Sequence, residues 1–190
     1  MANLFEMFKL SKTLEMTDGD LKLMGLDINI IPTSILTDIQ KGLIDSLGFS
    51  KTYDLLYTKA KTGSLEYNKT FIKKLNFTDK HKILEWQTKI VTFSGWGILE
   101  IAKIDFEKDS HVVKFNNSKL PKVYGKANYC VDIIPTGFVA GGLSAIYGKD
   151  FDALETKCIS HGDPFCEIEV GSPAYIKKRK AELWKKWKLQ

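Results

Sequence analysis

Residues 151–170 read FDALETKCISHGDPFCEIEV and contain the most specific pattern of the chain. Two runs within it, 151–159 and 165–170, have the apolar and polar pattern of short β-strands. The residues between the runs include a Gly-Asp-Pro sequence, which favours a turn. We therefore predict a closing β-hairpin that places Cys158 and Cys166 on its two arms.

Four residues in and before this hairpin have the side chains of a zinc site. Zinc takes four ligands in a tetrahedron and prefers thiolates. Cys158 and Cys166 can converge across the hairpin. Cys130, near the end of a predicted helix, could reach in from another layer, and Glu155 would add an oxygen ligand.

The spacing of these residues sets two conditions on a metal site. Glu155 and Cys158 are three residues apart and would point to opposite faces of a regular strand, so a bulge or strand end is required near Thr156–Lys157. The seven residues between Cys158 and Cys166 are not a standard zinc-finger spacing. On spacing alone, plain burial of the three cysteines is favoured. Their odd number argues against a disulfide framework.

Helical periodicity dominates the chain before this segment. A helix is predicted over 33–47, because Ile35, Ile39 and Leu43 share one face and Gly48 follows at its end. Further helices are predicted from 51 to an interruption at 63, and at 68–75, 79–95, 124–134 and 136–147. Strands are predicted at 21–31, 96–106 and 111–115. This order predicts an α+β fold, with an antiparallel sheet packed against helices.

The helix predicted at 136–147 is rich in small residues. Pro135 lacks a backbone donor and is expected to separate it from the preceding helix. Small side chains such as Gly137 and Gly141 would let a second backbone approach closely. Packing inside the core is favoured, and a dimer interface is the alternative.

The length of 190 residues fits a single domain with flanking segments. We predict an N-terminal segment over 1–20, a domain over 21–171 and a basic amphipathic helix over 172–190. The start of the chain lacks the continuous apolar core of a secretory signal, and no apolar run reaches the ~20 residues of a membrane span. A cytoplasmic protein is therefore expected.

The basic charge of the chain lies in its last residues. The net charge is +5, and 176–190 hold seven Lys and Arg but one acid, so the rest is nearly neutral. The domain itself is therefore not expected to bind nucleic acid specifically. Ile176, Leu183, Trp184 and Trp187 form an apolar stripe on this helix. The stripe could lie on an anionic membrane, dock a partner or second subunit, place its lysines on nucleic acid, or pack on its own domain.

Here the motifs resemble a known family. The chain is similar to 4-vinyl-reductase domains over roughly 21–170, and most closely over their C-terminal core. The shared motifs are Gly95-Trp96-Gly97, Leu99-Glu100-Ile101, Asn116-x-Ser118, and Cys130…Gly137-x-x-x-Gly141…Gly148…Glu155-x-x-Cys158…Gly162-Asp163-Pro164-x-Cys166-x-Ile168.

The resemblance implies a metal ion, a fold and a partner. The family includes the sensor domain of phenol-responsive transcription activators, which holds zinc with three cysteines and one glutamate. Those positions fall on Cys130, Glu155, Cys158 and Cys166, and four protein ligands imply a structural zinc. The implied fold is the 4-vinyl-reductase or NO-signalling and Golgi-transport ligand-binding type, shared with a vesicle-tethering subunit and often homodimeric.

Family members also enclose an apolar cavity between helices and sheet. Six aromatic residues are candidates for its lining, and one or two of them are expected there. They are Trp86, Phe93, Trp96, Tyr129, Phe138 and Tyr147.

The function predicted from these observations is a small-molecule-binding sensor or regulatory module for apolar or aromatic ligands. The chain lacks the Walker loop and the GxGxxG, GxSxG and HExxH motifs, so we expect a binding module rather than an enzyme. Two alternatives stay open. One is an accessory factor or reductase in tetrapyrrole synthesis, and the other is a tethering or assembly adaptor.

Overall fold

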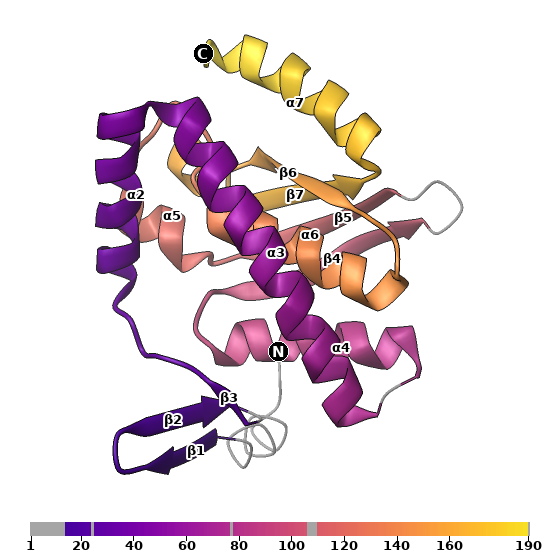
Figure 1. Cartoon of the computed structure of the whole chain (residues 1–190). Helices are drawn as coiled ribbons and strands as arrows, with labels where there is room; N and C mark the ends of the chain where they lie inside the picture. The colour runs from indigo at the N-terminus through magenta and orange to yellow at the C-terminus, as the bar shows by residue number, and fades with distance from the viewer. Residues whose placement is uncertain (1–13, 24, 77, 106–109, 190) are drawn as a thin grey trace.

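A four-stranded antiparallel sheet, in the order β4-β5-β7-β6, forms the centre of the molecule (Figure 1). The computed structural model describes residues 14–23, 25–76, 78–105 and 110–189, so positions 1–13 of the predicted N-terminal segment lie outside the described residues. The strands are β4 (Ile98–Asp105), β5 (Ser110–Asn116), β6 (Asp152–Lys157) and β7 (Cys166–Gly171). With helices packed on this sheet, the predicted α+β class is confirmed.

Helices pack on the sheet and on one another. Helix α6 (Ile133–Tyr147) packs on β6, and α4 (Lys80–Phe93) packs on β4. The long helix α3 (Phe49–Leu75) crosses α6 (Figure 1). The crossing is close because a Cβ added to Gly137 would lie 2.5 Å from the Tyr57 carbonyl oxygen. The small residues of α6 thus serve core packing, as favoured from the sequence.

One face of the sheet supplies two different environments. In the register of the strands, Val113 pairs with Ile168 and Phe115 pairs with Cys166. The first pair lies in an apolar cluster with residues of α4 and α6. The second pair lies in a separate cluster that contains the cysteines. The same side of the sheet therefore carries an aliphatic region at one end and a sulfur-rich region at the other.

A small three-stranded meander precedes the main body. It consists of β1 (Leu14–Thr17), β2 (Asp20–Leu23) and β3 (Leu26–Asp27). The buried Leu23 side chain packs against Phe71 and Ile90. This contact seats the meander on α3 and α4.

Helix α2 (Thr33–Leu47) forms where predicted, but its apolar face is not the buried one. Thr37 and Gln40 are buried, whereas Ile35 and Ile39 are exposed. Gln40 Nε2 donates to the Val131 carbonyl oxygen at 3.0 Å. The polar side is thus held to the body by the Gln40 hydrogen bond, which leaves an apolar surface facing outward.

Three predictions about helices were wrong. Gly63 does not interrupt α3, because one glycine costs a helix only about 1 kcal/mol and the helix is held by its packing on α6. The helix predicted at 124–134 is replaced by α5 (Lys119–Tyr124) and a non-helical segment. Pro135 does not precede α6 but lies in its first turn, where a missing backbone donor costs nothing.

Helix α7 (Pro173–Trp187) packs on the chain's own domain. Ser172 caps it as predicted, by accepting from the Tyr175 backbone N–H. The Trp184 ring lies 5.1 Å from the ring of Tyr53 and 5.4 Å from that of Phe49, centroid to centroid. Most of the apolar stripe on α7 is therefore packed against the chain's own domain. Within the described residues, every helix is too short or too polar to cross a bilayer.

Candidate functional site

The sulfur-rich end of the sheet gathers all four residues predicted as zinc ligands. Cys130 lies in the segment before α6, Glu155 in β6, Cys158 directly after β6, and Cys166 at the start of β7. All four are buried, and none of the cysteines forms a disulfide. The register of β6 shifts between Glu155 and Lys157, so the irregularity that the spacing requires is present.

The donor atoms form two overlapping groups. Cys130, Glu155 and Cys158 offer ligand atoms that all lie within 4.8 Å of one another. Cys166 belongs to a second group of the same size, with Glu155 and Asp132. Glu155 is therefore common to both groups, and Asp132 is a potential ligand that the sequence did not suggest.

Burial controls the protonation of this cluster. Burial raises the pKa of Glu155 well above its usual range, and the adjacent Asp132 carboxyl adds to the effect. Hydrogen bonds from the Cys130 and Cys166 thiols hold the pKa of the Cys158 thiol far below its usual value. Burial raises the pKa of Cys130, and the hydrogen bond to Cys158 raises that of Cys166. Without a metal, the cluster thus holds protons that a bound cation would displace.

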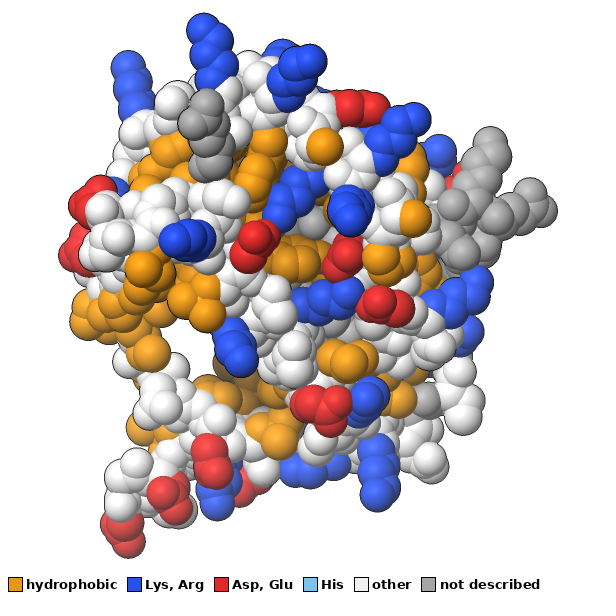
Figure 2. All heavy atoms as spheres, turned by 45° about the horizontal axis from the view of Figure 1, so that its top comes forward, with side chains coloured by type: hydrophobic (Ala, Val, Ile, Leu, Met, Phe, Trp, Pro, Cys, Tyr) orange, Lys and Arg blue, Asp and Glu red, His pale blue; other side chains and the backbone are white. Residues whose placement is uncertain are grey.

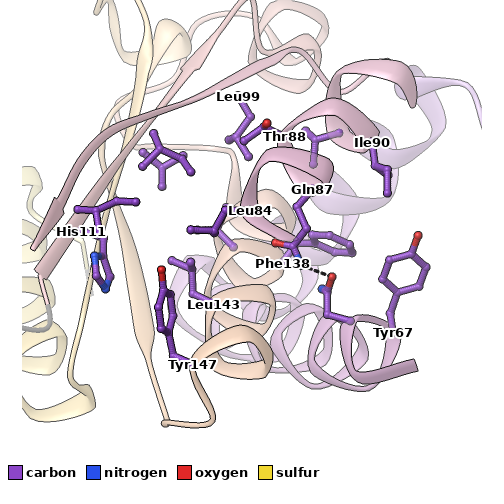
Figure 3. Close-up of a pocket in the computed structure, with 16 residues that line it drawn as sticks. Tyr67, Leu84, Gln87, Thr88, Ile90, Leu99, His111, Phe138, Leu143 and Tyr147 are labelled. Atoms are coloured by element: carbon purple, nitrogen blue, oxygen red, sulfur yellow. Dashed lines mark hydrogen bonds between the residues drawn. The ribbon is translucent and has the colours of Figure 1, made fainter. Parts of the chain in front are cut away.

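The aliphatic end of the sheet contains a partly open apolar cavity of about 60 Å³. Its walls come from α3, α4, α6, β4 and β5, and Figure 3 shows their side chains pointing toward a common space. The register of β4 shifts between Ile101 and Lys103, and this shift allows Leu99, Ile101 and Ile104 all to line the cavity. Leu84 and Leu143 close it from the helices.

A few polar groups stand at the cavity wall. Gln87 on α4 donates from Nε2 to Asn68 Oδ1 on α3 (Figure 3), and Asn68 Nδ2 donates to the Ser64 carbonyl oxygen at 2.8 Å. The rings of His111 and Tyr147 are stacked with centroids 5.7 Å apart. A small molecule in this space would meet an aliphatic surface with a side-chain amide pair on one side and a ring pair on another.

The six aromatic candidates divide between the cavity and the rest of the core. Phe138 and Tyr147 line the cavity, which agrees with the expected one or two. Trp86 and Phe93 pack instead near the meander. The remaining two, Trp96 and Tyr129, pack against the cysteine cluster.

Several wall and cluster residues were missed by the sequence analysis. His111 alternates with Val113 and Phe115 in β5, and Gln87 follows Ile83 and Leu84 at helical spacing in α4, so periodicity was the signal that could have found both. Asp132 follows Cys130 by two residues, and this proximity was the one available signal. A carboxylate so close to a candidate ligand can share its pocket when the backbone between them is not helical.

Solved structures of other proteins share this architecture. The phenol-responsive sensory domain of the transcription activator PoxR, solved with phenol, superposes with a TM-score of 0.77 at 20% sequence identity. The match covers 96% of each chain. The chain has the fold of that sensory domain.

Two further structures share the fold over less of the chain. A vinyl-4-reductase family protein from Methanocaldococcus jannaschii matches with a TM-score of 0.51 at 20% identity, over 75% of this chain and 82% of that one. A trafficking protein particle complex subunit 3 from Naegleria fowleri, covalently bound to palmitic acid, matches with 0.52 at 13% identity, over 73% and 93%. No family model and no curated protein matches the sequence. The predicted similarity to these three kinds of protein is thereby shown at the level of fold.

Proposed function

We propose that this protein is a ligand-binding sensory or regulatory module for small apolar or aromatic molecules. The observation that carries the proposal is the apolar cavity between β4, β5 and the helices. Its support is the sensory-domain fold, since the PoxR domain is solved with phenol. The polar groups at the wall would orient a ligand that carries one hydroxyl or carbonyl group.

The size of the cavity restricts the ligand. About 60 Å³ is well below the about 150 Å³ of a cavity that takes benzene. A single aromatic ring therefore enters only if wall side chains move outward. Phe138 is the natural side chain to move, because it lines the cavity and is 38% exposed.

Thermal unfolding of the full chain with phenol, cyclohexanol and succinate tests this function. Phenol or cyclohexanol is expected to raise the melting temperature in proportion to the logarithm of its concentration, because a ligand of the folded state stabilises it by mass action. Succinate, which is charged, should have no such effect. Native mass spectrometry should show a 1:1 complex, and no shift and no complex with either apolar probe would contradict the proposal.

We further propose a structural metal centre, with zinc held by Cys130, Glu155, Cys158 and Cys166. The residues fit the ion, because thiolate and carboxylate donors converge in a buried pocket and Glu155 Oε1 has no hydrogen-bond donor among the described residues. Bound zinc would supply the positive charge that this pocket lacks. The four residues would join the closing hairpin to the segment that leads into α6.

A homodimer is the third element of the proposal, and α2 is the surface that favours it. The apolar residues Ile30, Ile31, Ile35, Ile39 and Leu47 are exposed on α2 and the residues before it, and we call them the α2 patch. Apolar side chains gather on this side of the molecule, at the left of Figure 2. A contiguous exposed apolar surface of this kind usually marks a protein interface. Isologous pairing would bury the patch of both copies at once.

A tetrapyrrole reductase, a tethering adaptor and a cytoplasmic location stay predictions. Co-purified pigment would favour the reductase. Binding of the full chain, but not of a chain ending at Gly171, to anionic liposomes would favour the adaptor.

A further inference from the structure

Asp132 occupies a capping position without capping its helix. It is the N-cap residue of α6, where an aspartate usually accepts a hydrogen bond from a backbone N–H of the first turn. Its side chain makes no such bond, and the residue is fully buried. Neither of its carboxylate oxygens accepts a hydrogen bond of ordinary geometry among the described residues, although the Ser118 hydroxyl and the Cys166 thiol lie near enough to favour its charged form. The side chain is therefore turned away from the helix and toward the cysteine cluster.

The Asp132 carboxylate turns toward the cysteine cluster. An oxygen of Asp132, one of Glu155 and the sulfur of Cys166 all lie within 4.8 Å of one another. The backbone N–H of Asp132 donates to Glu155 Oε2 at 2.8 Å, while Glu155 Oε1 lacks a donor. Two buried carboxyl groups thus face each other across a space that also contains a sulfur.

Such an arrangement is costly unless a cation completes it. A buried polar atom without a partner loses its hydration and gains nothing in return. A second carboxylate nearby adds repulsion to this cost. No Lys, Arg or His among the described residues forms an ion pair with Asp132 or Glu155. A metal ion is the partner whose ligand chemistry matches carboxylate oxygen and thiolate sulfur together.

We infer that Asp132 is a metal ligand that binds on the Cys166 side of the buried centre. This inference rests on the metal centre proposed above and adds a donor to it. The centre then offers three sulfurs and two carboxylate groups where a tetrahedral ion takes four ligands, so Asp132 competes with a thiolate for one position. A mixed set of this kind suits zinc and other divalent ions rather than a soft ion such as Cu(I).

X-ray absorption at the zinc edge counts the ligands directly. We expect the full-length protein, loaded with one equivalent of zinc, to show two oxygen ligands in the first coordination shell in addition to the sulfur ligands. In Asp132→Asn, which keeps the shape of the side chain, one of these oxygens should be replaced by sulfur. Zinc affinity, measured by competition with a chromogenic chelator, should fall in the same variant.

Asp163→Asn is the matched control. Asp163 also lies beside the cluster, where its Oδ2 accepts from the Cys158 backbone N–H at 2.9 Å, but it is not among the grouped donors. It should leave the oxygen count unchanged. A single oxygen in the wild-type shell, or an unchanged shell in Asp132→Asn, overturns the ligand role of Asp132 while the metal centre stands. If the wild-type protein binds no zinc, the proposed centre itself fails. The wild-type spectrum decides the question even if Asp132→Asn does not fold.

Discussion

Gly141 of α6 passes so close to Lys61 of α3 that a Cβ added to the glycine would lie 2.2 Å from the Lys61 carbonyl oxygen. The backbone of Lys61 cannot move aside to make room, as the end of a flexible side chain could. The contact therefore fixes how α6 lies between α3 and the sheet. Both the cavity and the start of the cysteine cluster depend on that placement, since Leu143 and Asp132 belong to α6 and its cap.

Gly141→Ala is expected to destabilise the protein by about 1–3 kcal/mol or more, because overpacking against backbone forces the helices apart. Chemical denaturation measures this change. Gly63→Ala is the control, since nothing lies within 4 Å of a Cβ at that helical position. It should stabilise the protein by about 0.5–1 kcal/mol through helix propensity. Equal effects of the two substitutions would contradict the close crossing.

Cys158→Ser is expected to abolish binding of about one zinc per chain. Elemental analysis of the purified protein measures the metal. Free zinc at 100 times its dissociation constant adds about 2.7 kcal/mol to folding, so the variant and the chelator-treated wild type should both melt earlier. The chelator should not lower the melting temperature of Cys158→Ser further. A wild-type protein that melts at the same temperature with and without chelator would argue against a structural ion.

Val139→Phe is expected to remove the response to phenol and cyclohexanol, because Val139 lines the cavity and a ring at this position fills it. The melting temperature with each probe is the measurement. Val123→Phe makes the same change on α5, at a side chain that is 47% exposed and outside the cavity. That control should respond like the wild type. A response retained in Val139→Phe would place the ligand elsewhere.

Ile39→Asp is expected to convert the proposed homodimer to a monomer, because the α2 patch cannot bury a carboxylate at its centre. Light scattering after size exclusion gives the mass. Thr70→Asp introduces the same side chain at an exposed position of α3 and should leave the dimer intact. A wild-type mass of one chain at high micromolar concentration would count against the dimer.

Trp184→Ala is expected to cost about 1–3 kcal/mol, because the ring packs against Phe49 and Tyr53 and covers the upper part of the core. Denaturant unfolding measures the loss. Lys185→Ala, at the exposed neighbouring position, should change stability by no more than about 0.5 kcal/mol. A neutral Trp184→Ala would mean that α7 does not stay on the body in solution.

Features with a local cause were predictable from the sequence. The cap at Ser172 follows from a Ser-Pro pair, and the irregularity after Glu155 follows from the parity of a strand. The burial of Cys158 and Cys166 follows from their place in an apolar hairpin. In each case neighbouring residues alone determine the outcome.

Features with a distant cause were not predictable. Gln40 is buried because it meets the Val131 carbonyl, 91 positions later in the chain, and that contact reverses the face of α2. The segment after α5 is not helical although its residues allow a helix, because Ala127 N–H donates to the Ser160 carbonyl oxygen at 2.9 Å. Asp132 likewise turns toward Glu155 and Cys166, which are distant from it in the sequence. Tertiary contacts override the local pattern at these positions.

The covering of the cysteine cluster by α7 has a consequence for timing. Trp187, near the end of that helix, packs against the cluster and against the ring of His161. A zinc ion held by the proposed centre would be released only when α7 lifts, so its residence time would reflect the frequency of that opening more than the strength of its bonds.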